Sequence, residues 1–335
     1  MKLQGVRVLV TGGAGFIGSQ IVESLVRQGA KVRVFDNFSS GLRANLERVA
    51  KDIEVVEGDV RDRDAVFQAT RGCQVVNHQA AQLEITKCME DPIDDLRANT
   101  EATIHVLDAA AKTGVERLIY ASSACVYGQP KYIPSDETNH PTNPNWPYGA
   151  SKLAAEKYAA IFHDMTGIPM TGLRYAIIYG PREWYGRVLT IFLKRLAAGS
   201  APVVFGEGLE QRDFTFVEDV VALNDAVLAR DLPGHEILNV STGIPTTIAD
   251  LAKIVVEVTG VKVAPVHEDV RPGQRSEMVE ENRMRLPCEL KALVLDPAKA
   301  GRLLDWKAKV DLRSGLKREF SWLLENPTRW KKMSY

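Results

Sequence analysis

The chain has 335 residues, of which 45% are hydrophobic and 25% charged, and its formal net charge at pH 7 is −1. This length allows one large domain and a smaller one. Balanced charge without a basic block gives no electrostatic support for nucleic-acid binding. No apolar run approaches the roughly 20 residues that span a bilayer, so no membrane association is expected.

The cysteine spacing and the first residues of the chain indicate whether metal sites, disulfides or secretion are to be expected. Cys73, Cys88, Cys125 and Cys288 are scattered without metal-ligand spacing, so neither a metal site nor a disulfide framework is expected. The opening residues MKLQGVRVLV enter a strand pattern without the cleavage site of a secretory signal. We therefore expect a cytoplasmic location.

The first half of the chain alternates strand and helix patterns. The predicted elements are strand Arg7–Thr11, helix Phe16–Arg27, strands Val32–Phe35 and Ile53–Glu57, helix Arg63–Thr70, strand Gln74–Gln79, helix Asp94–Lys112, strand Arg117–Ala121, helix Tyr148–Met165 and strand Met170–Tyr175. Such alternation predicts a parallel sheet covered on both faces.

After Gly180 the elements become shorter and are joined by turns rich in proline and glycine. They are predicted at Val188–Ala198, Val203–Phe205, Val217–Ala229, Thr247–Thr259, Pro297–Leu304 and Leu312–Leu324. This pattern predicts a second, smaller lobe. The charged stretch Arg271–Lys291 has weak periodicity and is interpreted as a surface excursion or lid.

The most informative segment is Val8–Ser19, VLVTGGAGFIGS, in which a strand pattern breaks at Gly12, Gly13, Gly15 and Gly18 before a helix begins. Such a turn lets backbone N–H groups approach a pyrophosphate. The next strand ends in Asp36, where a carboxylate meets a ribose diol. The pattern predicts a Rossmann-type, doubly wound α/β fold that binds a dinucleotide. The alternatives, a glycine turn without a ligand and an Asp36 that only caps its own turn, have less support.

Tyr148 and Lys152 lie four residues apart on one helix face. A lysine cation beside a phenol is expected to lower the pKa of the phenol, which then serves as a general acid or base. Alone, this pair is better explained as a tyrosine that packs beside a lysine side chain. Its position after a buried strand that ends in Ser122 and Ser123 favours the catalytic reading.

At this point the chain resembles the extended short-chain dehydrogenase/reductases, in the nucleotide-sugar epimerase/dehydratase branch, over nearly its whole length. The matching segments are Thr11–Ser19, Asp36, Gly58–Asp62, His78–Ala81, Asn99, Ser122–Gly128, Tyr148–Lys152, Leu173–Tyr175, Tyr179–Arg182, Arg212–Phe214 and Val217–Val220. The resemblance implies an NAD-binding domain over residues 1–175. Residues 176–335 would form mainly a nucleotide-sugar-binding α/β lobe, with some chain crossing back.

The resemblance also implies roles for single residues. The catalytic residues would be Ser123, Tyr148 and Lys152. NAD would be bound by Gly12, Gly15, Phe16, Ile17, Gly18, Asp36, Asn37, Asp59, Val60, Ala80, Ala81, Asn99, Ser122, Tyr148, Lys152 and Tyr175. The substrate would contact Gln82, Ser123, Ala124, Tyr148, Ile177, Arg182, Val203, Arg212 and Arg275. Arg212 and Arg275 would hold its diphosphate; the alternative for each is a surface ion pair, with a neighbour such as Asp213 in the case of Arg212.

Ala124 and Cys125 bear on the reaction. The 4,6-dehydratases of this family carry a glutamate there, and the decarboxylases usually do so at the Cys125 position. Without a glutamate at either position, the segment resembles that of the 4-epimerases. These enzymes invert C4 of a nucleotide sugar through a 4-keto intermediate, and the resemblance implies a UDP-hexose as the substrate here. A keto-sugar reductase with net cofactor turnover and a non-catalytic NAD-binding regulator are the alternatives. The resemblance also implies a homodimer formed by the helices Asp94–Lys112 and Tyr148–Met165.

Three features depart from the family pattern. Ile177 stands where an asparagine is usual, the segment Glu183–Arg187 contains the unusual aromatics Trp184 and Tyr185, and Ser276–Leu290 is long. All three concern the substrate. His78 ends a buried strand and is interpreted as a core residue with satisfied hydrogen bonds.

Overall fold

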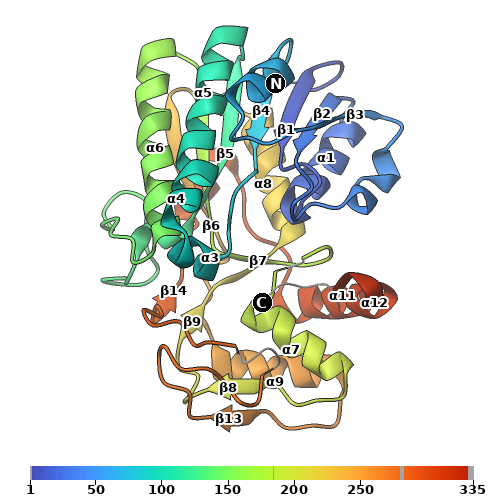
Figure 1. Ribbon diagram of the computed structural model, residues 1–335, viewed down its shortest axis with the longest axis vertical. Coiled ribbons are helices and arrows are strands. Elements are labelled where there is room, and N and C mark those ends of the chain that lie inside the picture. Colours follow the sequence, from blue (N-terminus) through green and yellow to red (C-terminus); the bar gives the residue numbers. More distant parts are fainter. Residues whose placement is uncertain (1, 184, 280–282, 331–335) are drawn as a thin grey trace.

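The structure is a computed structural model that describes residues 2–183, 185–279 and 283–330. Its upper half in Figure 1 is a seven-stranded sheet in the order β11-β6-β5-β4-β1-β2-β3, with every neighbouring pair parallel. The strands are β1 (Arg7–Thr11), β2 (Lys31–Asp36), β3 (Ile53–Glu57), β4 (Val75–His78), β5 (Arg117–Ser123), β6 (Met170–Tyr175) and β11 (His235–Val240). The predicted Rossmann-type fold is confirmed.

Helices cover both faces of this sheet. On one face α1 (Phe16–Arg27) packs against α8 (Val217–Ala229), and on the other α5 (Ala102–Thr113) packs against α2 (Arg63–Thr70) and α6 (Pro147–Thr166). Side chains of a strand alternate between faces. Val8 and Val10 of β1 therefore join the apolar cluster under α1, whereas Leu9 joins the cluster under α2 and α5.

The helix predicted at Asp94–Lys112 is interrupted. It consists of α4 (Pro92–Asp95), a π-helical segment η3 (Leu96–Glu101) and α5, and it follows a helix that was not predicted, α3 (Ile85–Glu90). The wider turn faces α6: Thr100 donates to the Ser151 carbonyl at 3.0 Å, and Asp95 accepts from the Ser151 hydroxyl at 2.5 Å. These tertiary hydrogen bonds explain a local geometry that sequence periodicity does not reveal.

The lower half of Figure 1 is built from short elements. Its strands form three small sheets: β7 (Ile177–Tyr179) with β10 (Phe214–Phe216), β9 (Gln211–Arg212) between β12 (Thr246–Thr247) and β14 (Ala292–Leu293), and β8 (Val203–Phe205) with β13 (Val266–Glu268). Its helices are α7 (Val188–Ala197), α9 (Ile248–Thr259), α10 (Ala298–Leu304), α11 (Leu312–Glu325) and α12 (Pro327–Trp330). The remaining short helices are η1 (Arg43–Asn45), η2 (Glu47–Val49) and η4 (Ala124–Tyr127).

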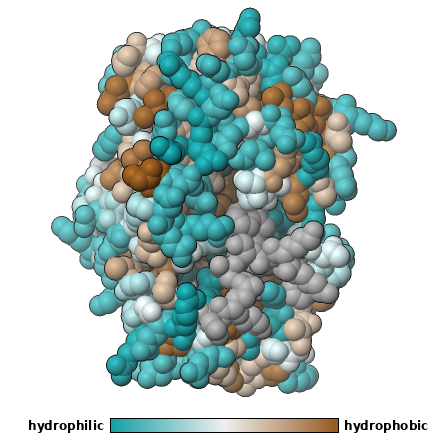
Figure 2. Space-filling model, viewed as in Figure 1, coloured by the Kyte–Doolittle hydropathy of each residue, from teal (hydrophilic) through white to brown (hydrophobic). Residues whose placement is uncertain are grey.

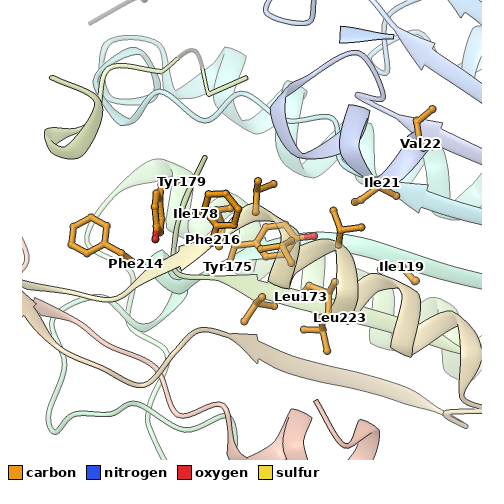
Figure 3. Close-up of a cluster of buried hydrophobic side chains, with 14 of the residues drawn as sticks. Ile21, Val22, Ile119, Leu173, Tyr175, Ile178, Tyr179, Phe214, Phe216 and Leu223 are labelled. Carbon is orange, nitrogen blue, oxygen red and sulfur yellow. The ribbon is translucent and has the colours of Figure 1, made fainter. Parts of the chain in front are cut away.

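One apolar core connects the two halves. Ile21 and Val22 of α1 and Leu173 of β6 belong to the same cluster as the aromatic rings of Tyr179, Phe214 and Phe216, which Figure 3 shows side by side. The strand β11, which the sequence analysis did not predict, returns from the C-terminal half to pair with β6. Residues beyond 176 thus contribute both to the smaller lobe and to the large sheet.

The stretch Arg271–Lys291 does not lie wholly on the surface. Val279 packs with Ile191 and Val203, and Leu290 is buried beside Cys125 in another cluster. In the space-filling view the surface is mainly hydrophilic, with apolar residues in separate groups (Figure 2). None of the helices in the described ranges is long and apolar enough to cross a membrane.

Candidate active site

A cavity of about 840 Å³ lies between the carboxyl ends of the large sheet and the smaller lobe. Its volume is within the range of small-molecule sites. Of the predicted cofactor-binding residues, those that line it are Gly12, Gly15, Phe16, Ile17, Gly18, Asp36, Asn37, Asp59, Val60, Ala80, Ala81, Ser122, Tyr148, Lys152 and Tyr175. The structure therefore brings together residues that are spread over about half of the sequence.

The glycine turn after β1 is too tight for side chains. A Cβ on Gly12, whose φ is +65°, would lie 2.7 Å from the Ala80 nitrogen, and one on Gly18 would lie 2.1 Å from the Gly12 carbonyl oxygen. Helix α1 begins there without a side-chain cap. The uncapped first turn of α1 thus faces the cavity with its N–H groups, which suits a pyrophosphate.

Two carboxylates, Asp36 and Asp59, line the cavity near this glycine turn. Asp36 is almost buried and accepts hydrogen bonds from the backbone N–H groups of Ala14 at 2.9 Å and Phe38 at 2.8 Å. Asp59 accepts from Asn37 at 2.9 Å and pairs with Arg61, which holds the pKa of Asp59 well below its usual range. Asp36 thus does cap its own turn, and its side chain also borders the cavity.

The predicted catalytic residues lie together at the cavity wall. Tyr148 is at the start of α6, one turn before Lys152, whose ammonium lies 5.9 Å from the centre of the Tyr148 ring. Lys152 donates to the Ala121 carbonyl at 3.0 Å, and Ser123 at the end of β5 is hydrogen-bonded to Tyr148. All three line the cavity, as the sequence predicted.

The expected effect of Lys152 on the Tyr148 phenol is wrong for this structure. Burial raises the pKa of Tyr148, and the cation that counteracts burial is Arg187 rather than Lys152. Burial also lowers the pKa of Lys152 to about 8. The lysine is therefore still mostly charged near neutral pH, but the desolvation of the phenol outweighs the effect of that charge.

Asn99 does not line the cavity itself. It is buried, accepts a hydrogen bond from the Gln82 nitrogen at 3.1 Å and donates to the Gln82 carbonyl at 2.9 Å. Gln82 does line the cavity, so Asn99 positions the wall instead of forming it. His78 is buried between Thr11 and Thr103, at 2.6 and 3.2 Å, which confirms its interpretation as a core residue.

Several predicted substrate residues lie elsewhere. Arg182 has a φ of 78° and directs its guanidinium to Ser19, at 3.1 Å, and Glu23 of α1. An ion pair between the lobe and α1 thus holds Arg182 outside the cavity lining, and its contact with substrate stays a prediction. Val203 packs within the lobe against Ile191, and Ala124 is buried while its neighbour Cys125 lines the cavity.

The predicted diphosphate-binding arginines also lie outside the cavity lining. Arg212 is buried beside it, donates to the Leu290 carbonyl at 2.9 Å and lies 3.6 Å from the Glu289 carboxylate. The alternative was an ion pair between Arg212 and Asp213, but Asp213 accepts hydrogen bonds from the backbone N–H groups of Thr242 and Gly243. The backbone of Arg275 forms an isolated antiparallel β-bridge with Met284 within the stretch Arg271–Lys291. Ile177, in contrast, does line the cavity.

The sequence analysis did not assign other residues that line this cavity. Glu183, Tyr185 and Arg187 border it, and so do Arg43 and the C-terminal residues Thr328 and Arg329. The unusual composition of the segment Glu183–Arg187 was the available signal; Trp184 lies outside the described residues. For the C-terminal pair the sequence held no signal, because α12 reaches the cavity only through tertiary packing.

Comparison with known proteins agrees with this geometry. Residues 8–241 match the NAD dependent epimerase/dehydratase family. The chain belongs to this family. A putative UDP-glucose 4-epimerase of Methanocaldococcus jannaschii is 35% identical over 95% of this chain and 99% of its own.

Solved structures of family members are equally similar. A UDP-glucose 4-epimerase of Thermotoga maritima with UDP-glucose has a TM-score of 0.85, is 32% identical and covers 96% of this chain and 100% of its own. A Thermus thermophilus UDP-glucose 4-epimerase complex with NAD has a TM-score of 0.83, is 33% identical and covers 95% and 99%. Relatives of 28 to 30% identity also include dehydratases and a decarboxylase, so similarity identifies the family and not the reaction.

NAD is the cofactor of this enzyme family, and the residues present fit it. The side-chain-free turn at Gly12 and Gly18 leaves room for a pyrophosphate against the uncapped start of α1. Asp36 still has lone pairs for a ribose diol, because a carboxylate accepts about four hydrogen bonds and two are used. Tyr148 and Lys152 lie farther along the same cavity, where the nicotinamide half would lie.

Proposed function

We propose that this protein is an NAD-dependent epimerase that inverts C4 of a nucleotide sugar, with a UDP-hexose as the expected substrate. The observation that carries the proposal is the grouping of Ser123, Tyr148 and Lys152 on one cavity wall with Cys125 beside them. Burial raises the pKa of the Cys125 thiol, which stays protonated, and Ala124 has no acidic group. This wall supports reversible oxidation and lacks the extra carboxylate that water elimination needs.

Each residue has a distinct task in this proposal. Tyr148 takes the proton from the C4 hydroxyl, a role in which the positive charge of a bound nicotinamide would offset the burial that raises its pKa, and Ser123 at the end of β5 also binds that hydroxyl. Lys152 holds the nicotinamide ribose. NAD, when bound, would supply the redox chemistry as a reversible hydride acceptor for C4. The 4-keto sugar turns over in the cavity, so that hydride would return to the opposite face of C4 while Tyr148 gives its proton back to the C4 oxygen.

The diphosphate end is proposed to involve Arg212. Its buried guanidinium lies 3.6 Å from Glu289, a longer separation than a close ion pair, and the wall between it and the cavity contains Leu290 and Leu293. A diphosphate offers more charge and bidentate geometry than this single carboxylate. A shift of the stretch Arg271–Lys291 around Leu290 would let the Arg212 guanidinium exchange the Glu289 carboxylate for the diphosphate of the substrate.

Two further expectations remain proposals. Tyr158, Ile161 and Met165 leave 41, 52 and 73% of their surfaces exposed on α6, at the spacing of one helix face. Such a face supports a homodimer that buries α6 against its copy, which light scattering of the purified protein measures. The cytoplasmic location also remains a prediction.

The proposal is tested by product analysis. Purified protein is incubated with UDP-glucose, UDP-N-acetylglucosamine and dTDP-glucose, and the products are identified by NMR. C4 epimers formed without added NADH support the proposal. Steady NADH consumption would instead favour the keto-sugar reductase, and a 4-keto-6-deoxy sugar would overturn the epimerase proposal in favour of dehydration.

A further inference from the structure

Arg187 places a cation at the end of the cavity where Tyr148 lies. Its side chain lines the cavity, and its positive charge counteracts the burial that raises the pKa values of Tyr148 and Cys125. Arg187 also donates to the carbonyl of Ile178, which lines the same cavity as Tyr148, so the guanidinium lies on the wall that a bound sugar would face.

The protein itself makes little use of this guanidinium. Among the described residues, Arg187 donates from Nη1 to the Ile178 carbonyl at 3.1 Å, its Cζ lies 5.5 Å from the centre of the Tyr185 ring, and the carboxylate that it meets, Glu183, is 4.0 Å away. A guanidinium has five N–H donors in a planar fork that matches a carboxylate. Arg187 therefore has donors left for an anion in the cavity.

Glu183 is a poor counter-ion because it lies beside a second buried carboxyl. Glu319 on α11 is 1% exposed, and within the described parts of the chain three of the four carboxyl oxygens, Oε2 of Glu183 and both of Glu319, have no hydrogen-bond partner. Burial raises the pKa of both groups, and the charge of Glu183 raises that of Glu319 further. The other groups facing the pair are Arg187, Thr190 and the Tyr179 phenol.

Two such carboxyls retain protons at neutral pH instead of ionising together. The pair consequently carries less than two negative charges, and the positive charge of Arg187 is not fully neutralised. A sugar without a charged group would gain nothing from this positive charge, whereas a sugar with an acidic substituent would be attracted by it.

We propose that Arg187 is a specificity-determining residue that recognises a carboxylate at C6 of the sugar, with Glu183 and Glu319 keeping the guanidinium available. This inference rests on the proposed C4 epimerase function. C6 is attached to C5, the ring carbon next to C4, whereas the diphosphate is attached across the ring at C1. A cation beside Tyr148 therefore meets the C6 group and not the phosphates, and the substrate is a nucleotide uronate.

The test compares kcat/KM for UDP-glucuronic acid and UDP-glucose. The wild-type protein should prefer the uronate, and Arg187→Gln should reduce this ratio about 10- to 100-fold, the range expected for a lost hydrogen bond to a charged group. Glu183→Gln, which mimics the protonated carboxyl, should keep the preference for the uronate. Arg313→Gln, which removes an exposed arginine paired with Glu257, is the matched control and should leave both values unchanged.

A wild-type preference for UDP-glucose, or a ratio that Arg187→Gln does not change, overturns the inference. Calorimetric titration with the same two nucleotide sugars separates this result from a failure of the proposed function. If neither sugar is epimerised but the uronate binds more tightly and Arg187→Gln abolishes the difference, recognition by Arg187 stands and the epimerase proposal fails. Equal dissociation constants for both sugars overturn the recognition.

Discussion

Replacing Glu183 by glutamine should make the protein more stable at alkaline pH. Burial raises the pKa of Glu183 from 4.5 to about 7, and Arg187 and Thr190 only partly counteract it. Between these values the unfolded chain loses the proton while the folded chain keeps it, so the free energy of unfolding falls as pH rises. A tenfold change in an acid constant is worth about 1.4 kcal/mol, so the whole effect is about 3 kcal/mol above pH 7.

Glutamine does not ionise, so the variant lacks this loss of stability. We expect Glu183→Gln to unfold with nearly the wild-type free energy at pH 5 and with about 3 kcal/mol more at pH 8.5. Urea denaturation followed by circular dichroism at both pH values measures the difference. Glu325→Gln, an exposed carboxyl at the end of α11, is the control and should follow the wild type at both. A difference between Glu183→Gln and wild type that is the same at both pH values refutes the reasoning.

Three further changes test the active-site assignments. Tyr148→Phe should retain cofactor and lower turnover by about 10² or more, the range for a positioned acid or base; rates near wild type would remove Tyr148 from the mechanism. Arg212→Ala should raise KM for a nucleotide sugar while cofactor retention, measured by absorbance, changes little; the reverse result contradicts a substrate role. NAD should bind more tightly than NADP to stripped protein, because the buried Asp36 repels a 2′-phosphate, and calorimetry that finds equal affinities would disprove this.

Local sequence patterns were sufficient for the elements that build the cofactor half. The strand β1, the helix α1 and the strand β3 have the predicted bounds, because each has a strong local periodicity or a glycine turn at its end. The same holds for the position of Ser123, Tyr148 and Lys152 on one cavity wall. Parallel strands place their carboxyl ends at one edge, so the order of these motifs along the chain implies that they meet.

Residues whose roles depend on long-range packing could not be predicted in this way. Arg182 was expected at the substrate, but an ion pair with Glu23 of α1 holds it outside the cavity lining. The pairing of Glu183 with Glu319 joins a loop after β7 to the helix α11 near the C-terminus.

The sequence alone therefore determined the fold class, the glycine turn and the catalytic group, because short-range patterns of polarity and chain flexibility encode them. The tertiary structure decided which charges face the cavity, since the pKa and the partner of a buried side chain depend on groups that distant segments bring beside it. Arg187 illustrates both: its segment was unusual in sequence, but only the packed structure places its guanidinium next to Tyr148.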